Sequence, residues 1–488
     1  MINLGIISNV LGVLLTIVGV MMLAPLSCTF IYDTPDKTPF IFSTITTISV
    51  GLLSWFYKFK NTERIGKRDG YLVVSLGWVA MCLFGSMPFI LSGQFNTPAD
   101  AIFEGVSGLT ATGATILDDI EKMPEDILLW RSVLQWLGGM GMIVLTVAIF
   151  PLLGIGGVEL FVNESPGPAS DKIHPRIREV AKRLWFIYVG MTLLVIILLK
   201  LAGMTIFDSI NHAFTTMATG GYSTKNASIG HYNSPLIEYI IIVFMFLSGM
   251  NFTLIYFGLK GNFKKIIKSD EFKFYARNVL LLTLFLSTFL FFNSHYESYE
   301  KAFRVSLFNL ISIITTTGYA TADYTVWSPF ITFIFLGLCF MGGCGGSTTG
   351  GIKQIRLLVV FKNAILEFKR ILHPRAMIRV KIDGNVVAGK TLINILLFVS
   401  IFWTIFMFST GFMVWVLEDT KTPLLTAAGA VAASISNVGP GIGEVGPVNT
   451  YSGIPSVGKY FLSFLMLLGR LELFTVLIVF TPFFWTRN

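Results

Sequence analysis

Four segments of the chain end in a polar stretch that contains glycine, and the backbone of these stretches could bind ions without any reactive side chain. The clearest case is Thr317-Gly318-Tyr319, which follows a long apolar run. Glycine adopts positive φ readily, and such torsions allow consecutive carbonyl oxygens to line a narrow path. Carbonyl dipoles around an axis can replace the hydration shell of a cation. Because one strand cannot surround an ion, this chemistry requires several such segments in register.

The four segments, at residues 97–115, 205–224, 299–321 and 422–443, align on one glycine each. The aligned glycines are Gly113, Gly220, Gly318 and Gly439, and the residues nine positions earlier are Glu104, Asn211, Asn309 and Ala430. A filter for potassium is the interpretation that explains all four together. Its predicted residues, with potassium at the backbone carbonyls, are Thr110, Ala111, Thr112, Gly113, Ala218, Thr219, Gly220, Thr316, Thr317, Gly318, Asn437, Val438 and Gly439.

A second glycine-rich stretch, GGCGGSTTGGIK at residues 342–353, interrupts an apolar segment. Each glycine costs a helix about 1 kcal/mol relative to alanine, so this density predicts an unwound loop within the membrane. We expect a mobile gate beneath the filter, and a broken packing helix is the alternative. The predicted gate residues are Gly342, Gly343, Gly345, Gly346, Ser347, Thr348, Thr349, Gly350, Gly351 and Arg470.

Arg470 belongs to this prediction because it interrupts the last apolar segment of the chain. A charge at the centre of a bilayer costs at least about 2.5 kcal/mol and almost always faces a cavity or a partner. Glu472 is two residues away and does not share its helix face. Arg470 is therefore expected either to face the pore as a positive barrier or to pair with an acid on another helix.

The elements that must position these residues are membrane spans. The 488 residues are 53% hydrophobic and only 13% charged, which predicts an integral membrane protein. We expect an all-α polytopic membrane protein with ten transmembrane helices. Four pseudo-fourfold repeats of span, re-entrant pore helix and span surround a central pore, after two extra N-terminal spans. The predicted spans are 4–25, 39–58, 71–92, 128–153, 184–203, 235–258, 276–294, 327–346, 391–417 and 457–485.

The same pattern divides the chain into an N-terminal extension followed by four pore repeats. The expected boundaries are residues 1–69 for the two-helix extension, 70–182, 183–274, 275–389 with the gating loop, and 390–488.

The basic residues predict the orientation of these spans. Of the 36 Lys and Arg residues, 25 lie in the connections 58–70, 155–184, 259–277 and 353–390. The positive-inside rule makes these connections cytoplasmic, and an even number of spans then makes both termini cytoplasmic. All four filter segments lie on the opposite side. The formal charge of +8 is thus a signal of topology, and nucleic acid is not an expected partner.

The four filter segments, WLGGMGMIV at 136–144, the glycine-rich loop and LLGRLELF at 467–474 resemble the Trk/Ktr/HKT superfamily of potassium transporters. The two extra spans make the chain most similar to the bacterial Trk type. The resemblance implies a pseudo-fourfold pore, an intramembrane loop and a pore-facing arginine. It also implies a homodimer in the lipid of the bacterial inner membrane, and a cytoplasmic regulatory protein that binds NAD or ATP.

The sequence also bears on other function classes. The chain has no Walker A or GxGxxG motif, so it is not expected to bind a nucleotide itself. Its five histidines lack metal-ligand spacing, so an enzyme is not expected. A proton- or sodium-coupled potassium symporter remains open. So does a less selective monovalent cation channel, because Val438 and Pro440 depart from the other three filters and Pro440 has no N–H to donate.

Overall fold

The computed structural model describes residues 2–32, 34, 36–57, 66–144 and 173–486 of the chain. Apart from one two-residue hairpin, β1 Lys381–Ile382 with β2 Asn385–Val386, the regular elements of these residues are helices. The expectation of an all-helical membrane protein is therefore confirmed. Most of the predicted connections 58–70 and 155–184, and the end of the predicted span 128–153, lie outside the described residues.

Six described helices are long and apolar enough to cross a membrane. They are α1 Leu4–Met21 continued by α2 Leu23–Ile31, α3 Thr38–Phe56, α4 Lys67–Leu91, residues 179–201 of α9 Ile173–Leu201, α14 Asp270–Phe292 and α18 Gly389–Val416.

Two bent helix pairs raise this number to eight. α11 Pro235–Ser248 and α12 Phe252–Leu259 meet at 108°, and α20 Ser456–Arg470 meets α21 Leu473–Leu477 at 112°. A glycine lies at each bend, Gly249 at the first and Gly469 at the second. The ten predicted spans are thus recovered in part.

The two remaining predicted spans differ from a simple membrane helix. α6 Glu125–Val144 reaches the limit of the described residues, and α16 Pro329–Cys339 has only 11 residues. The non-helical segment 340–353, called the loop from here on, separates α16 from α17 Gln354–Leu372. Glycine density explains this break, because six glycines in twelve positions remove most of the helix propensity.

Four short helices occupy the predicted re-entrant segments. They are α5 Pro98–Leu109, α10 Ile206–Met217, α15 Tyr299–Ile314 and α19 Pro423–Ser436, with 12 to 16 residues each. At 1.5 Å per residue each measures roughly 18–24 Å, short of a hydrocarbon core of about 30 Å. Proline is the first helical residue of α5 and α19, where its missing N–H costs no hydrogen bond because that N–H has no partner within the helix. These short helices are therefore too short to cross a membrane.

The short helices organise the packing of the longer ones into four triplets: α4–α5–α6, α9–α10–α11, α14–α15–α16 and α18–α19–α20. Within each triplet, the first helix packs against the short helix. The third helix packs against the short helix of the next triplet: α6 on α10, α11 on α15, α16 on α19, and α20 back on α5. This succession closes on itself, so the triplets surround one axis.

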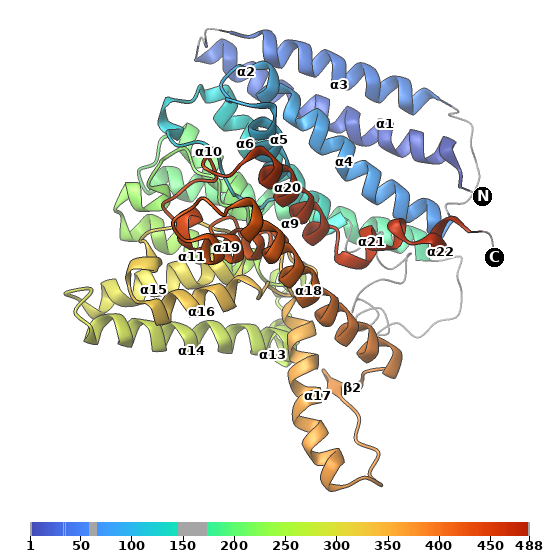
Figure 1. The fold of residues 1–488 in the computed structure, drawn as a ribbon, viewed down its shortest axis with the longest axis vertical. Coiled ribbons are helices and arrows are strands. Elements are labelled where there is room, and N and C mark those ends of the chain that lie inside the picture. Colours follow the sequence, from blue (N-terminus) through green and yellow to red (C-terminus); the bar gives the residue numbers. More distant parts are fainter. Residues whose placement is uncertain (1, 33, 35, 58–65, 145–172, 487–488) are drawn as a thin grey trace.

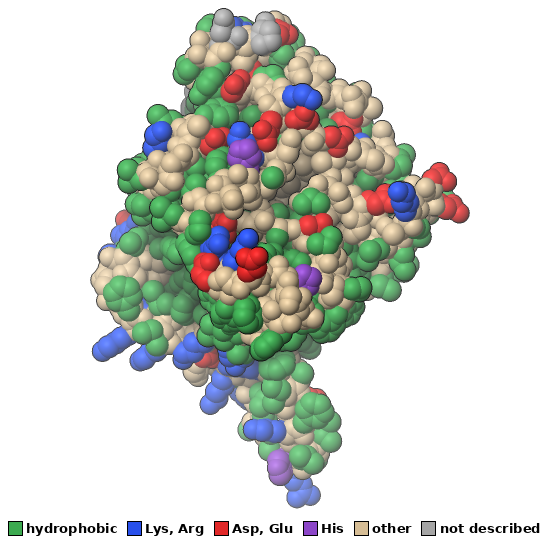
Figure 2. Space-filling view, turned by 90° about the vertical axis from the view of Figure 1, so that its left-hand side faces the viewer, with side chains coloured by type: hydrophobic (Ala, Val, Ile, Leu, Met, Phe, Trp, Pro, Cys, Tyr) green, Lys and Arg blue, Asp and Glu red, His purple; other side chains and the backbone are tan. Residues whose placement is uncertain are grey.

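Figure 1 shows α1 and α3 on the outer side of α4, and α17 extending from the body of the molecule. The two termini lie at the same end of the molecule, where Arg68 donates a hydrogen bond to the carbonyl of Thr486 over 2.8 Å. Figure 2 shows one face with charged and polar side chains over its upper and middle parts, hydrophobic side chains along much of its left and right sides, and Lys and Arg side chains toward the bottom. Such an apolar border is expected where helices contact lipid.

Two buried ion pairs join neighbouring triplets. Lys459 of α20 lies 2.6 Å from Asp100 of α5, and Arg304 of α15 lies 2.7 Å from Glu238 of α11. Asp100 also caps α5 together with Thr97. Breaking a buried pair from one side leaves a buried charge without its partner, which destabilises far more than losing an exposed pair.

We predict that Asp100→Ala lowers the free energy of unfolding by roughly 3–5 kcal/mol, because Lys459 stays buried without its carboxylate. The additional change Lys459→Met is expected to restore part of this loss. The matched control is Glu179→Ala, which removes an exposed pair with Arg183 worth at most about 1 kcal/mol. Thermal unfolding of the purified variants in one detergent measures the effect. Equal melting of the Asp100 and Glu179 variants contradicts the prediction.

Candidate functional site

All four short helices end in the same backbone geometry. The first or second residue after each helix adopts a left-handed conformation, with φ between 51° and 55°. The next N–H then donates to a carbonyl five residues earlier over 2.8–2.9 Å, as Thr112 does to Ser107 and Val438 does to Ala433. This is a helix C-terminal capping arrangement. The four left-handed residues are Ala111, Thr219, Thr316 and Asn437.

Two residues after each left-handed residue stands a glycine with φ between 74° and 94°. In three segments it is the predicted glycine, but in the second it is Gly221 rather than Gly220. The predicted register of that segment was wrong by one residue, because consecutive glycines are equivalent in a pattern and only the end of α10 distinguishes them. With this register, His212 rather than Asn211 corresponds to Glu104, Asn309 and Ala430 in the alignment. The positive-φ glycines are Gly113, Gly221, Gly318 and Gly439.

These glycines bring the four segments together in a closed ring. A methyl carbon built on any of them lies closer than 3.0 Å to a carbonyl oxygen of the next triplet. Gly113 faces the oxygen of Gly220, Gly221 that of Thr317, Gly318 that of Val438, and Gly439 that of Thr112. We call the carbonyls of Thr112, Gly220, Thr317 and Val438 the carbonyl ring. Real Cβ atoms do not approach oxygen this closely, so the ring requires glycine at all four positions.

Buried polar side chains bind the chain that follows three of the four predicted filter segments. Glu104 accepts a hydrogen bond from the N–H of Ile116 over 3.0 Å. His212 Nε2 lies 3.0 Å from Ser223 Oγ, and Asn309 donates to Thr321 over 3.1 Å. Each contact ties the chain that leaves a filter to the short helix that entered it. The fourth position is Ala430, whose methyl group cannot make such a bond.

Glu104 has further partners that connect the first two filters. Arg131 of α6 lies 2.8 Å from its carboxylate, and both side chains are buried. The guanidinium of Arg131 also stacks on the ring of Tyr222, 4.0 Å from the ring centre. Tyr222 in turn donates to the carbonyl of Glu104 over 2.9 Å. Tyr319, which follows α15, makes the same type of contact with α10, donating to the carbonyl of His212 over 3.2 Å.

The loop lies directly against the filter. The N–H of Gly350 donates to Thr316 Oγ1 over 2.8 Å, and Thr219 Oγ1 donates to Thr348 Oγ1 over 3.2 Å. The residues of the loop nearest the filter, 347–350, are buried. Glu271 of α14 binds both sides of the loop, at the N–H of Gly345 over 2.6 Å and of Ile355 over 3.1 Å. The loop is therefore non-helical, as predicted, and its backbone is extensively hydrogen-bonded.

Arg470 contacts the same loop. Its two terminal nitrogens donate to the carbonyl of Thr348 over 2.8 Å and to that of Gly138 over 3.0 Å. Within the described residues, no carboxylate lies within ion-pair distance of Arg470. Glu472 instead pairs with Arg356 of α17, whose guanidinium lies 3.9 Å above the ring of Phe398. Among the described residues, Arg470 thus bonds backbone carbonyls and does not form the structural ion pair that was the alternative.

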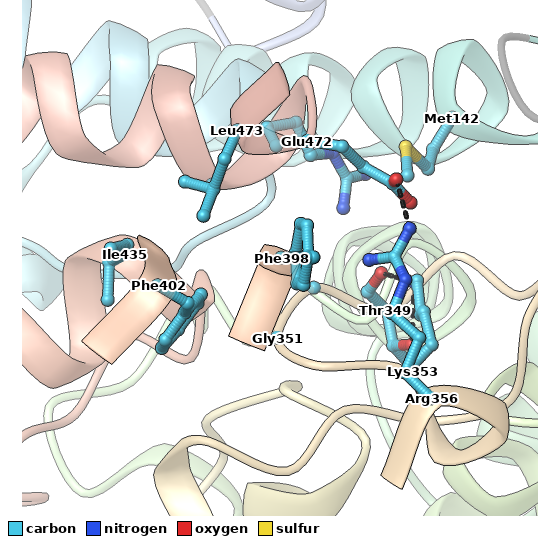
Figure 3. A pocket seen from close by; sticks show the side chains of 13 residues that line it. Met142, Thr349, Gly351, Lys353, Arg356, Phe398, Phe402, Ile435, Glu472 and Leu473 are labelled. Carbon is cyan, nitrogen blue, oxygen red and sulfur yellow. Dashed lines mark hydrogen bonds and ion pairs between the residues drawn. The ribbon is translucent and has the colours of Figure 1, made fainter. Parts of the chain in front are cut away.

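A small cavity lies between the loop, α18 and the break after α20. Figure 3 shows Ile435, Phe402, Phe398 and Leu473 on one side of it, and Thr349, Lys353 and Arg356 on the other. Its volume available to the centre of a water molecule is about 10 Å³, room for about one water molecule. No hydrated cation fits this space.

The sequence analysis missed Lys353, which ends the motif GGIK and is buried beside the cavity. Its ammonium donates a hydrogen bond to the carbonyl of Thr349. Lys353 was counted in the cytoplasmic connection 353–390, outside the predicted spans, so the rule that singled out Arg470 as a charge inside an apolar segment was not applied to it. Gln135 was also missed, and it contacts the carbonyl of Gly220 over 2.7 Å. A polar residue in the otherwise apolar run around 136–144 was the available signal.

Comparisons with known proteins agree with this geometry. The family model TrkH, described as a cation transport protein, matches residues 37–487. The Trk system potassium uptake protein TrkH of Vibrio parahaemolyticus is 40% identical over 488 residues, covering 98% of this chain and 99% of that protein. The Trk system potassium uptake protein TrkG of Escherichia coli K12 is 34% identical, and the match covers 99% of both chains.

A solved structure provides the comparison in three dimensions. The crystal structure of the potassium transporter TrkH from Vibrio parahaemolyticus superposes with a TM-score of 0.90 at 36% identity, covering 99% of this chain and 100% of that one. Both the sequence and the architecture thus match over essentially the whole length. The chain belongs to the TrkH family of cation transport proteins.

Proposed function

We propose that this chain takes up potassium across the bacterial inner membrane by a channel-like route through the carbonyl ring. The closed ring of four carbonyls, one from each triplet, is the observation that carries the proposal. Oxygen dipoles at the ends of four short helices suit a dehydrated monovalent cation. The names of the relatives, which are potassium uptake proteins, support potassium as the ion. The proposed filter comprises the thirteen predicted residues together with Gly221.

The loop and Arg470 are proposed as the gate of this route. The loop lies against Thr219 and Thr316 at the ends of two short helices, and Arg470 bonds its Thr348 carbonyl. The positive charges of Arg470 and Lys353 lie at the cavity beside the loop, where they repel a cation. A cavity with room for about one water molecule supports a closed state, since a hydrated ion has no space there.

The remaining features of the system are proposed by analogy with the Trk relatives. We propose ten membrane spans, the five sequence units given above as structural units, and a homodimer that works with a cytoplasmic regulatory protein binding NAD or ATP. Both termini are proposed to be cytoplasmic, and their location at one end of the molecule supports an even number of spans. The chain itself is proposed to bind potassium and no nucleotide.

The filter is tested by Gly318→Ser. A side chain at this positive-φ position strains the backbone and collides with the Val438 carbonyl, so we expect the ratio of potassium to sodium permeability to fall at least about tenfold, the effect of 1.4 kcal/mol. Gly337→Ser is the matched control, because a Cβ at Gly337 in the same triplet meets nothing within 4 Å. Reversal potentials in proteoliposomes give the ratio. A parent-like ratio for folded Gly318→Ser rejects the filter.

Arg470→Ala is expected to raise rubidium flux in liposomes that contain only this chain. One charge about 4 Å from a passing cation matters by roughly 4 kcal/mol at an effective dielectric of 20. Arg470→Lys keeps the charge and is expected to keep most of the block. Thermal stability of the same samples provides the check, since a destabilised alanine variant without increased flux means that Arg470 has a structural role instead.

Deleting Gly345–Thr349 is expected to raise flux in the absence of any partner or nucleotide. The deletion removes Thr348, which contacts both Thr219 and Arg470, and so removes the proposed obstruction below the ring. Rubidium uptake is compared with that of the parent protein at equal reconstituted amounts. Flux at or below the parent level in a monodisperse deletion variant supports the broken packing helix instead of a gate.

A further inference from the structure

Gln135 on α6 is the one side chain among those described that donates a hydrogen bond from its amide to the carbonyl ring. Its Nε2 donates to the Gly220 oxygen over 2.7 Å, and its Oε1 accepts from the N–H of Tyr222 over 3.2 Å. The residue is fully buried. These two bonds lie on either side of Gly221, so a single amide fixes both peptide groups of the positive-φ glycine in the second filter.

The second filter needs this support because of its own sequence. The residue before the positive-φ glycine is threonine or valine in the other filters (Thr112, Thr317 and Val438), but it is Gly220 here. Two consecutive glycines without side chains leave the backbone unusually free. In the first and third filters the threonine is held locally: Thr110 lies 2.7 Å from Thr112, and Thr315 lies 2.8 Å from Thr317, between hydroxyl oxygens.

Gln135 occupies the space that this missing side chain leaves. A Cβ on Gly220 lies within 3.0 Å of three side-chain atoms of Gln135. The φ of Gly220 is not in the left-handed region, so its backbone tolerates an ordinary residue. Contact with Gln135, rather than conformation, therefore excludes a side chain at position 220. The two residues form a complementary pair, small on the filter and long on the helix behind it.

The next triplet contains the other form of this pair. Gly139 of α6 packs against Ala218, and Gly249 at the end of α11 packs against Thr315. Ala218 and Thr315 are corresponding residues, each directly after the end of a short helix. Four residues before these glycines stand Gln135 and Met245. Met245 is buried, and its side chain carries no N–H to donate to a carbonyl of the filter. By position in the sequence, Met245 and Thr317 thus correspond to Gln135 and Gly220.

We propose that Gln135 is a positioning residue that determines ion selectivity by fixing the direction of the Gly220 carbonyl in the ring. The proposal rests on the proposed function of the ring as a potassium filter. The amide holds the carbonyl in register with the other three oxygens, and its N–H occupies one lone pair of that oxygen. Without it, the Gly220–Gly221 peptide turns more freely and the ring adapts to a smaller cation such as sodium.

The direct test is Gln135→Met, which keeps the length of the side chain and removes both hydrogen bonds. The ratio of potassium to sodium permeability in proteoliposomes is expected to fall about threefold to tenfold, as expected for the loss of a bond of about 1 kcal/mol. The matched control Met245→Leu changes the corresponding position behind the third filter and is expected to keep the parent ratio. A folded Gln135→Met variant with the parent ratio overturns the proposal.

A pair exchange separates positioning from simple packing. Gly220→Thr alone is expected to lose selective flux, because its side chain meets Gln135. The double variant Gln135→Met with Gly220→Thr reproduces the pair of the third filter and is expected to recover at least half of the parent selectivity. A double variant that is no more selective than the worse single variant contradicts the proposal. Failure of both Gln135→Met and the double variant to fold makes Gln135 a folding requirement and also overturns it.

Gly318→Ser, measured in the same type of preparation, distinguishes failure of the proposed filter from failure of the proposed role of Gln135. If Gly318→Ser lowers the permeability ratio and Gln135→Met does not, the filter stands and only the role of Gln135 is rejected. If neither change alters the ratio, the proposed function of the ring fails as well.

Discussion

The contact between a glycine Cα of one triplet and a carbonyl oxygen of the next is the constraint on which the rest of the structure depends. Four such contacts close the ring, and none leaves space for a Cβ. The distance between the four segments of the ring is thus limited by backbone atoms alone. The capped ends of the short helices, the buried polar residues behind them and the helices between triplets all serve to hold the backbone at this separation.

Although the ring is closed by equivalent contacts, its four sides are supported by different chemistry. The first has a buried ion pair, Glu104 with Arg131. The second has a histidine and the amide of Gln135, the third has Asn309, and the fourth has Ala430 at the same position. Equivalent geometry with unequal support means that the four carbonyls differ in stiffness. If the ring is the proposed filter, its selectivity is an average over four unlike ligands.

The sequence predicted this architecture well where a pattern is local. Apolar length predicted the long helices, and glycine density predicted the break between α16 and α17. The sequence pattern could not decide which glycine of the second filter aligns with the others, because only the end of α10 distinguishes Gly220 from Gly221. The partners of Arg470 and Glu472 were also unpredictable, because they depend on contacts between residues more than 100 positions apart. A sequence without an alignment carries no information on such pairs.

The hydrogen bonds between the loop and the filter have a thermodynamic consequence. Gly350 and Thr348 of the loop bond the hydroxyl groups of Thr316 and Thr219, the left-handed residues on which the second and third strands of the ring turn. Movement of the loop therefore takes partners away from the filter itself. If the ring is the proposed potassium filter, linkage requires that its occupancy by an ion and the position of the loop influence each other by the same free energy in both directions. The affinity of the proposed filter for a cation is then a property of the conformational state as well as of the four carbonyls.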